Sequence, residues 1–347
     1  MGQGRPAVHD GRRQPVRRQA GRVQGQAAGA DKRVTAIQTE GLTKRFDNGR
    51  GCSDVSINVR EGEAFGFLGP NGAGKSTCVK MLVGLIFPTE GRASLFGEPI
   101  GSLAARRLIG YLPELYRYQE WLTGEEVVRL HARLCRLPRA EADRRVPQLL
   151  ERVGIGLRSR DRVKNYSKGM QQRLGLACAL VGDPRILFLD EPSSAMDPIG
   201  RSEVRELLHE LKAQGKTIFL NSHLMEDVES LCDRVALLNN GRILQQGTVE
   251  EVLQQRPVWR LRVGGFIPSL LDWLTGETGL AVRLADSEPD GSAVLEVELE
   301  NDEQAGWLHA TIMDQGMTLY ESARARTRLE EWFVTELSGK SHRGEKA

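Results

Sequence analysis

A glycine-rich stretch that ends in a lysine and two hydroxyl residues is the part of this sequence best suited to chemistry. It reads Gly69-Pro70-Asn71-Gly72-Ala73-Gly74-Lys75-Ser76-Thr77 and fits the pattern G-x-x-x-x-G-K-[ST]. Its glycines let the backbone curl so that N–H groups point at phosphate oxygens, and a helix after it would add the positive end of its dipole. Lys75 can reach the β- and γ-phosphates, and Ser76 can ligate Mg²⁺. The stretch therefore predicts a nucleoside triphosphate site.

The segments on both sides of this loop supply the context that the pattern requires. Ala64–Leu68 is a short apolar run, which predicts a buried parallel strand. Cys78–Phe87 is apolar at helical spacing and stops before Pro88, which predicts a helix. A strand, a phosphate loop and a helix in this order argue against a chance match.

Two adjacent carboxylates and a histidine follow two further predicted strands. The apolar run Ile186–Leu189 ends at Asp190 and Glu191. The run Thr217–Leu220 is followed by His223. Asp190 can hold Mg²⁺, while Glu191 can orient and deprotonate the water that attacks the γ-phosphate. Because the ends of parallel strands meet at one edge of a sheet, we expect His223 to face the same crevice.

A second turn has the composition of an anion-binding site. The string YSKGMQQR, residues 166–173, leads into an apolar helix predicted over Leu174–Val181. Ser167, Gly169 and the N-terminus of that helix could form a nest of backbone N–H groups. One nucleotide does not need two such nests from the same chain. We therefore infer that each of two chains supplies its nest to the nucleotide of the other.

The motifs GPNGAGKST, YSKGMQQR, ILFLDEP, SSAMDP and NSH, in that order, resemble the ATP-binding subunit of ATP-binding cassette (ABC) transporters from about Thr35 to Leu253. The resemblance implies an α/β P-loop NTPase cassette with a RecA-like core of parallel strands, an antiparallel β subdomain and a helical insertion at about residues 115–181. It also implies a homodimer, or a pair with another cassette, that sandwiches ATP, so that Ser167 and Gly169 of one subunit face the ATP of the other.

The resemblance also assigns roles to single residues. It implies catalytic roles for Lys75, Glu191 and His223. It implies Mg²⁺ ligation by Ser76, Asp190 and Glu114. Contacts with ATP are implied for Phe46, for Gly69, Pro70, Asn71, Gly72, Ala73, Gly74, Lys75, Ser76 and Thr77 of the loop, and for Glu114, Ser167, Gly169 and Asp197.

Three positions depart from the family pattern or have a second interpretation. Phe46 matches the aromatic residue that stacks on adenine in the family, but an ordinary core aromatic would fit the sequence equally well. Glu114 stands where the family most often has Gln, and a carboxylate can contact Mg²⁺ or water but cannot donate as an amide does. Lys168 replaces the first glycine of the usual L-S-G-G-Q turn, where it either adds positive charge near the γ-phosphate or points to solvent.

Composition restricts the class of protein. The 347 residues include 48 Lys and Arg and 46 Asp and Glu, with a net charge of +6 in residues 1–33 and −4 in the rest. The body of the chain therefore offers no electrostatic support for nucleic-acid binding. Five scattered cysteines without a C-x-x-C pair favour a reducing compartment over a disulfide framework or a zinc site. The sequence has no run of 18 apolar residues that would predict a membrane span.

We divide the chain into three parts. Residues 1–33 form a basic leader without the apolar core of a signal peptide, and we expect it to be disordered. A nucleic-acid or anionic-lipid arm and a start site assigned too far upstream are the alternatives. Residues 34–254 form the ATPase domain. Residues 255–347 form a small α+β accessory domain, which serves regulation or dimer contact, or packs as a lid on its own subunit.

Local patterns predict elements within the ATPase domain. Val55, Ile57 and Val59 alternate with polar residues, which predicts one strand with a wet face. The segment from Thr123 to Glu126 has the form of a capping box that opens a helix. Asn240-Gly241 predicts a two-residue hairpin.

The accessory domain has its own patterns. Trp259–Val263 and Leu295–Leu299 predict two half-buried strands whose wet faces carry opposite charges, so that the strands could pair. A helix is predicted to begin near Leu329, with apolar residues along one side. Together these patterns predict the α+β class for this domain.

From these observations we expect an ATPase that powers export through a separately encoded membrane permease. The chain would then be cytoplasmic and peripheral on the inner face of the cell membrane. The alternative is a soluble ABC-type ATPase that acts on nucleic acid or ribosomes. Proteins of that kind usually carry two cassettes in one chain or long coiled-coil arms, and neither is visible in this sequence.

Deleting residues 1–33 should leave the melting temperature and the ATPase rate nearly unchanged, because the leader has no pattern of buried residues. Thermal denaturation and an ATPase assay on the full-length and truncated chains check this. A large fall in melting temperature would show that the leader packs against the body.

Overall fold

The computed structural model describes residues 1–2, 34–47, 49–115, 117–253, 258–288, 291–299, 301–324 and 329–341. The leader that we predicted to be disordered lies outside the described residues, except for Met1 and Gly2. Within the described ranges, no helix combines the length and the apolar character needed to cross a membrane.

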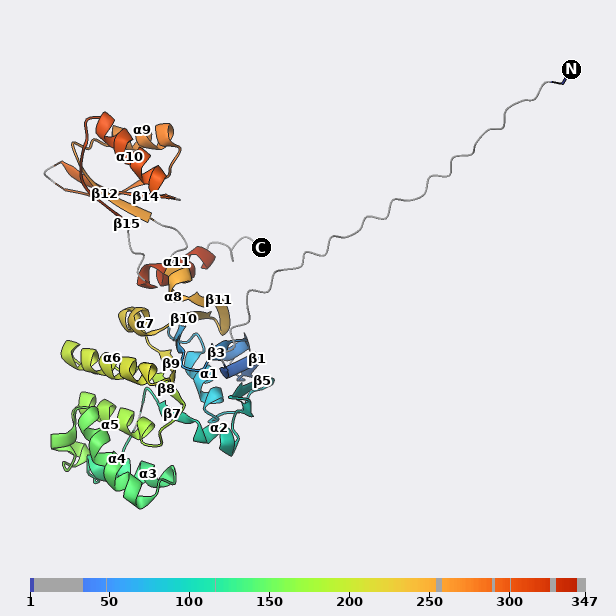
Figure 1. Ribbon diagram of the computed structural model, residues 1–347, viewed down its shortest axis with the longest axis vertical. Helices are drawn as coiled ribbons and strands as arrows, with labels where there is room; N and C mark the ends of the chain where they lie inside the picture. The colour runs from blue at the N-terminus through green and yellow to red at the C-terminus, as the bar shows by residue number, and fades with distance from the viewer. Residues whose placement is uncertain are drawn as a thin grey trace. The chain divides into compact units, whose positions relative to one another are not determined.

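A six-stranded sheet lies at the centre of residues 34–253 (Figure 1). Its order is β11-β10-β4-β9-β8-β7, and the strands from β10 to β7 run parallel. The strands are β4 (Ala64–Leu68), β7 (Ile109–Leu112), β8 (Ile186–Asp190), β9 (Thr217–Asn221), β10 (Arg234–Asn239) and β11 (Arg242–Thr248). The predicted hairpin at Asn240-Gly241 is confirmed, because β11 returns antiparallel to β10 and both turn residues have positive φ.

The central strands are apolar along their whole length because both faces of this sheet are covered. Phe65, Phe67, Phe188 and Phe219 share one hydrophobic cluster with residues of α1 (Lys75–Leu82). The ring centroid of Phe219 lies 5.3 to 5.7 Å from those of the other three. The alternate residues of these strands pack with three other helices, namely α5 (Lys168–Leu180), α6 (Pro198–Ala213) and α7 (Met225–Leu231).

Helix α1 is shorter than we predicted. The apolar pattern over Cys78–Phe87 indicated a helix up to Pro88, but α1 ends at Leu82. Gly84 follows with φ 74°, and its N–H bonds to the carbonyl of Met81. A left-handed glycine after the last turn is a common way to end a helix, so Gly84 and not the proline stops it.

A second, antiparallel sheet packs into the same cluster as α1. Its order is β2-β1-β5-β6, and β3 also pairs with β1. The elements are β1 (Thr35–Arg45), β2 (Gly51–Val55), β3 (Asn58–Arg60), β5 (Glu90–Leu95) and β6 (Glu98–Pro99), followed by α2 (Leu103–Arg107).

The single strand that we predicted from Val55, Ile57 and Val59 is in fact two strands, β2 and β3. All three residues are buried, as the alternation indicated. At the break, the hydroxyl of Thr39 in β1 donates to the carbonyl of Val55 and accepts from the N–H of Ile57, each at 2.8 Å. These bonds take the place of ladder bonds, so the backbone can leave the strand without an unpaired buried group.

Two helices and two short 3₁₀ turns form the helical insertion before α5. They are α3 (Gly124–Leu134), α4 (Arg139–Arg152), η1 (Gly156–Arg158) and η2 (Val163–Asn165). The predicted capping box is confirmed, since Thr123 Oγ1 accepts from Glu126 N and the Glu126 carboxylate accepts from Thr123 N at 2.8 Å. Helices α3 and α4 pack on α5, which carries the second predicted anion site at its N-terminus.

Residues 258–324 form a β-α-β-β-α-β unit with a four-stranded antiparallel sheet in the order β13-β14-β12-β15, which is the ferredoxin-like arrangement. Its elements are β12 (Val258–Gly264), α9 (Ser269–Thr278), β13 (Val282–Ser287), β14 (Ser292–Glu298), α10 (Asp302–Asp314) and β15 (Thr318–Arg324). The predicted pairing of opposite charges is confirmed, because Arg260 of β12 lies opposite Glu296 of β14 and forms a 2.7 Å ion pair with it.

The last helix, α11 (Leu329–Ser341), packs on α7 and α8 (Val249–Leu253) (Figure 1). Leu329 and Trp332 are buried in the cluster that includes α7. The N–H of Leu329 also donates to the carboxylate of Glu229 on α7. Helix α11, which we grouped with the accessory domain, thus contributes side chains to the hydrophobic cluster on one face of the central sheet.

Trp332→Ala should weaken the docking of α11 by about 3 kcal/mol, because it removes a large buried side chain and leaves a cavity. We expect faster proteolytic removal of α11, measured by mass spectrometry of timed digests, and a lower melting temperature. Trp307 on α10 is 48% exposed, against 5% for Trp332, so Trp307→Ala is the matched control. Equal cleavage rates in the two variants would contradict the docking of α11 through Trp332.

Candidate functional site

The phosphate loop joins β4 to α1 and takes its shape from glycine. Gly74 precedes α1 with φ 102°, a left-handed conformation. A Cβ at this position would lie 2.4 Å from the carbonyl oxygen of Gly51, closer than real contacts allow. The loop therefore rests directly on the backbone of β2, which no other residue at position 74 would permit.

Lys75 folds back over the loop. Its Nζ donates to the carbonyls of Gly69, at 2.7 Å, and Pro70, at 3.2 Å. Burial lowers the pKa of Lys75, and the carboxylates of Glu191, Asp190 and Glu114 act in the opposite direction, with Glu191 the strongest of the three. The ammonium thus lies within electrostatic reach of all three acidic residues that the sequence placed at the site.

Asp190 ends β8 with a buried side chain that is 3% exposed. The pKa of Asp190 is raised to about 6, chiefly by burial and also by the neighbouring Glu114 and Glu191, although a hydrogen bond from Asn221 Nδ2 and the charge of Lys75 act in the opposite direction. These acidic groups destabilise one another, so this part of the site favours a bound cation.

A magnesium ion bound with the nucleotide fits these residues. No group of three or more His, Cys, Asp and Glu residues in the described ranges could hold a metal by itself. Buried carboxylate and hydroxyl oxygens together with phosphate oxygens are the ligands that Mg²⁺ uses in such sites. Among the described residues, Asn221 Oδ1 is also buried without a hydrogen-bond partner, which leaves one acceptor available to a donor from outside the chain.

Glu191 and His223 come together as the sequence predicted. The N–H of His223 donates to Glu191 Oε1 at 3.0 Å, and Nδ1 of the same histidine lies 2.7 Å from Oε2. Both carboxylate oxygens therefore have a partner on the segment after β9. Glu191 has φ 55°, a left-handed conformation that is uncommon outside glycine.

Two polar residues at this edge were not singled out from the sequence. Asn221 bonds to Asp190, and Gln172 of α5 bonds to the loop that follows Glu191. Both lie inside motifs that we recognised, Asn221 in NSH and Gln172 in YSKGMQQR. Their place within these motifs could have marked both residues as candidates. Their partners could not be predicted, because each contact joins elements that are distant in the sequence.

The second anion site lies at the N-terminus of α5. Ser167 is the N-cap, and its Oγ accepts from Met170 N at 3.2 Å. In the described part of the chain, no hydrogen bond joins Ser167 to the phosphate loop. A Cβ at Gly169 would meet nothing closer than 3.6 Å, so the packing of this chain does not itself require glycine there.

Three further predicted ATP contacts occupy exposed positions. The ring of Phe46 is 42% exposed, with the Lys44 ammonium 5.5 Å from its centroid, so Phe46 is not a core aromatic. Glu114 is exposed just after β7. Asp197 is the N-cap of α6 and accepts from Gly200 N at 2.7 Å.

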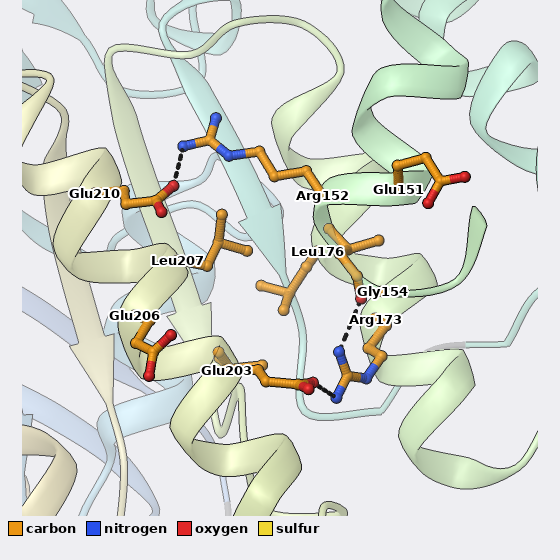
Figure 2. Close-up of a pocket in the computed structure, with 11 residues that line it drawn as sticks. Glu151, Arg152, Gly154, Arg173, Leu176, Glu203, Glu206, Leu207 and Glu210 are labelled. Atoms are coloured by element: carbon orange, nitrogen blue, oxygen red, sulfur yellow. Dashed lines mark hydrogen bonds and ion pairs between the residues drawn. The ribbon is translucent and has the colours of Figure 1, made fainter. Parts of the chain in front are cut away.

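A groove of about 310 Å³ lies elsewhere, between the end of α4, α5 and α6 (Figure 2). Ion pairs join Arg152 to Glu210 and Arg173 to Glu203 across it. None of the residues that line it belongs to the predicted nucleotide site.

The chain is similar to known proteins over most of its length. The family model described as ABC transporter matches residues 52–194. An uncharacterized ABC transporter ATP-binding protein of Nostoc sp. is 38% identical over 83% of this chain and 82% of its own length. The bacitracin transport ATP-binding protein of Bacillus licheniformis is 31% identical over 88% of this chain and 98% of its own length.

The fold is shared with a solved structure. A dimeric ATP-binding cassette in a post-hydrolysis state, bound to ADP and Pi, is 25% identical, with a TM-score of 0.57 over 61% of this chain and 98% of that one. The phosphate loop, the Asp190–Glu191 pair and His223 meet at one edge of the same kind of sheet here. The chain therefore belongs to the ATP-binding proteins of ABC transporters and is a nucleotide-binding ATPase.

Proposed function

We propose that two copies of this chain bind MgATP between them and that hydrolysis drives export through a separately encoded membrane permease. The observation that carries this proposal is the arrangement at the ends of β8 and β9. There, both oxygens of Glu191 are held by His223, next to the buried Asp190 and within electrostatic reach of Lys75.

Glu191 is the proposed general base. Its carboxylate accepts a proton from water as the water oxygen attacks the γ-phosphorus, and the bond to the bridging oxygen breaks to leave ADP. His223 fixes the orientation of the carboxylate through two contacts. Lys75 supplies positive charge for the phosphates once its present partners, two backbone carbonyls, are exchanged for phosphate oxygens.

Mg²⁺ would be held by Ser76 and Asp190, with Glu114 as a further ligand from the end of β7. When bound, the ion neutralises charge on the β- and γ-phosphates. The rest of the loop Gly69–Thr77 would supply backbone N–H groups, and Phe46 an exposed ring for the adenine.

A second copy of the chain is the proposed partner at the other side of the ATP. Ser167 and Gly169 stand at the N-terminus of α5, and a small residue at position 169 is not needed for packing within one chain. A phosphate from a second chain could use the space and the N–H groups there. The similar cassette bound to ADP and Pi is dimeric, which supports this arrangement.

The proposed membrane contact lies on the helical insertion, next to Glu114. Leu115, Trp121 and Leu157 are 86%, 71% and 97% exposed, so large apolar side chains of this part of the chain are available to a partner. A permease that covers them would place the chain at the inner face of the cell membrane. A relative from Rhizobium sp. is named for the export of Nod factor, and this supports export as the direction.

We assign the ATPase function to residues 34–254 and an accessory role to residues 255–347. The ferredoxin-like unit has its own hydrophobic cluster, centred on Leu261, Leu295 and Leu308, which supports a separate role.

Lys75→Ala should abolish turnover or raise the KM for ATP strongly, because it removes the charge placed on the phosphates. The fold should persist, since the Lys75 ammonium donates to two carbonyls of its own loop and forms no ion pair among the described residues. Lys80 is an exposed lysine on the same helix, so Lys80→Ala is the matched control. ATPase assays and circular dichroism of both variants decide, and wild-type turnover in Lys75→Ala would refute the phosphate-loop assignment.

Glu191→Gln should bind ATP without hydrolysing it, because the amide keeps the size of the side chain but cannot accept the proton. The variant should therefore accumulate as an ATP-dependent dimer, whereas the wild type stays largely monomeric when isolated from its permease. Size-exclusion chromatography with light scattering, with and without MgATP, measures this. A Glu191→Gln protein that stays monomeric at saturating ATP would contradict the two-chain site.

The same assay tests the second anion site. Adding Ser167→Arg to Glu191→Gln should abolish the dimer, because the larger side chain fills the nest. Ser202 is an exposed serine on α6, and Ser202→Arg in the same background should leave the dimer intact. Dimerisation that survives Ser167→Arg would remove Ser167 from the interface.

A further inference from the structure

The backbone of the proposed general base is held in an unfavourable conformation. Glu191 has φ 55°, although it carries a full side chain. Such residues persist only where their surroundings hold them, and they concentrate at active sites. The contacts of the Glu191 main chain therefore bear on the function of its side chain.

Two elements hold this main chain. Its N–H donates to the carbonyl of Asn221 at the end of β9, at 2.8 Å. Its carbonyl accepts from Nε2 of Gln172 on α5, and the hydroxyl of Ser194 lies 3.2 Å from the same oxygen. The main chain of Glu191 is thus fixed from the central sheet on one side and from α5 on the other.

Gln172 makes a second bond to the same loop. Its Oε1 accepts from the N–H of Ala195 at 3.2 Å, so one amide group spans the loop from Glu191 to Ala195. The side chain of Gln172 is 3% exposed, and both ends of its amide have partners in the loop. A buried amide with both ends engaged has little freedom to reorient.

We propose that Gln172 is a positioning residue for Glu191, and that it links the anion site at the start of α5 to the base of the same chain. Gln172 holds the Glu191 carbonyl toward α5, and in this main-chain conformation the Glu191 carboxylate points to His223. Gln172 lies little more than one helical turn after Ser167. A phosphate bound at Ser167 would therefore act on the helix that sets the geometry of the other ATP site. This inference rests on the proposed role of Glu191.

Gln172→Met and Gln172→Glu test the proposal. Methionine keeps the length of the side chain and removes both hydrogen bonds, whereas glutamate keeps the acceptor for Ala195 and loses the donor to Glu191. Each variant should lower kcat by about 10- to 100-fold, the range expected when a reacting group is displaced by about 1 Å. The KM for ATP should change by less than about twofold, because the phosphate loop is intact.

Gln171 provides the matched control. It is the same residue type one position earlier on α5, and its Nε2 lies 3.4 Å from the carbonyl of Tyr166 instead of the Glu191 loop. Gln171→Met should keep kcat within about twofold of wild type. Equal losses of kcat in Gln171→Met and Gln172→Met would overturn the proposal, as would a wild-type kcat in Gln172→Glu.

The Glu191→Gln background separates positioning from a purely structural role. If Gln172 acts through Glu191, Gln172→Met should add less than about twofold to the loss of single-turnover rate already caused by Glu191→Gln. The double variant should still form the ATP-dependent dimer in light scattering. Loss of that dimer would mean that Gln172 only maintains the N-terminus of α5, and it would overturn the proposal.

A different result would contradict the proposed function itself. Wild-type turnover in Glu191→Gln alone would remove Glu191 as the base, whatever the Gln172 variants do. A slow Glu191→Gln protein combined with a normal Gln172→Met protein would keep the base and reject Gln172 as its positioning residue.

Discussion

The packing of Phe219 against Phe65, Phe67 and Phe188 is the interaction on which the site depends. These rings belong to β9, β4 and β8, which are neighbours in the central sheet. Asp190 is the last residue of β8, and the segments that follow the three strands carry the phosphate loop, Glu191 and His223. Because both faces of the sheet are closely packed, a slip of one residue would exchange side chains between the faces and would leave cavities on one face and overpacking on the other. The positions of the polar groups at the strand ends are thus set by apolar contacts below them.

The charged groups at this edge of the sheet are buried without full compensation, unlike the polar groups of an ordinary protein core. Burial acts against the charged forms of both Asp190 and Lys75, and the neighbouring carboxylates repel one another. The ammonium of Lys75 donates to two carbonyls of its own loop. A ligand that brings both phosphate oxygens and a divalent cation would relieve each of these conditions at once.

How much could be predicted from the sequence depends on the range of the interactions involved. The capping box at Thr123, the hairpin at Asn240 and the charge pair of Arg260 and Glu296 were predicted because each arises within one element or between paired strands. The phosphate loop was predicted from its glycine and lysine pattern between a strand and a helix, and the approach of His223 to Glu191 was predicted because parallel strands end at a common edge. The break between β2 and β3 was missed because the hydroxyl that stabilises it belongs to Thr39, on another strand.

Contacts between elements without a shared edge were beyond the reach of the patterns. The glutamine string gave no sign that Gln172, and not its neighbour, reaches the Glu191 loop. The apolar side of α11 could be predicted from the sequence, but its packing on α7 could not. Periodicity identifies the face of a helix that is buried and not the element against which it packs.

The docking of α11 changes what kind of attachment the ferredoxin-like unit has. The unit is inserted between α8 and α11, and both of these helices pack on the same core, so the chain leaves the cassette and returns to it. A domain tethered at both ends samples far fewer positions than one that hangs from a single linker, which raises its effective concentration near one surface. Its second tether sits on α7, the helix that begins two residues after His223. Release of that tether would convert an insertion into a pendant domain, and it would do so at a helix next to the catalytic edge.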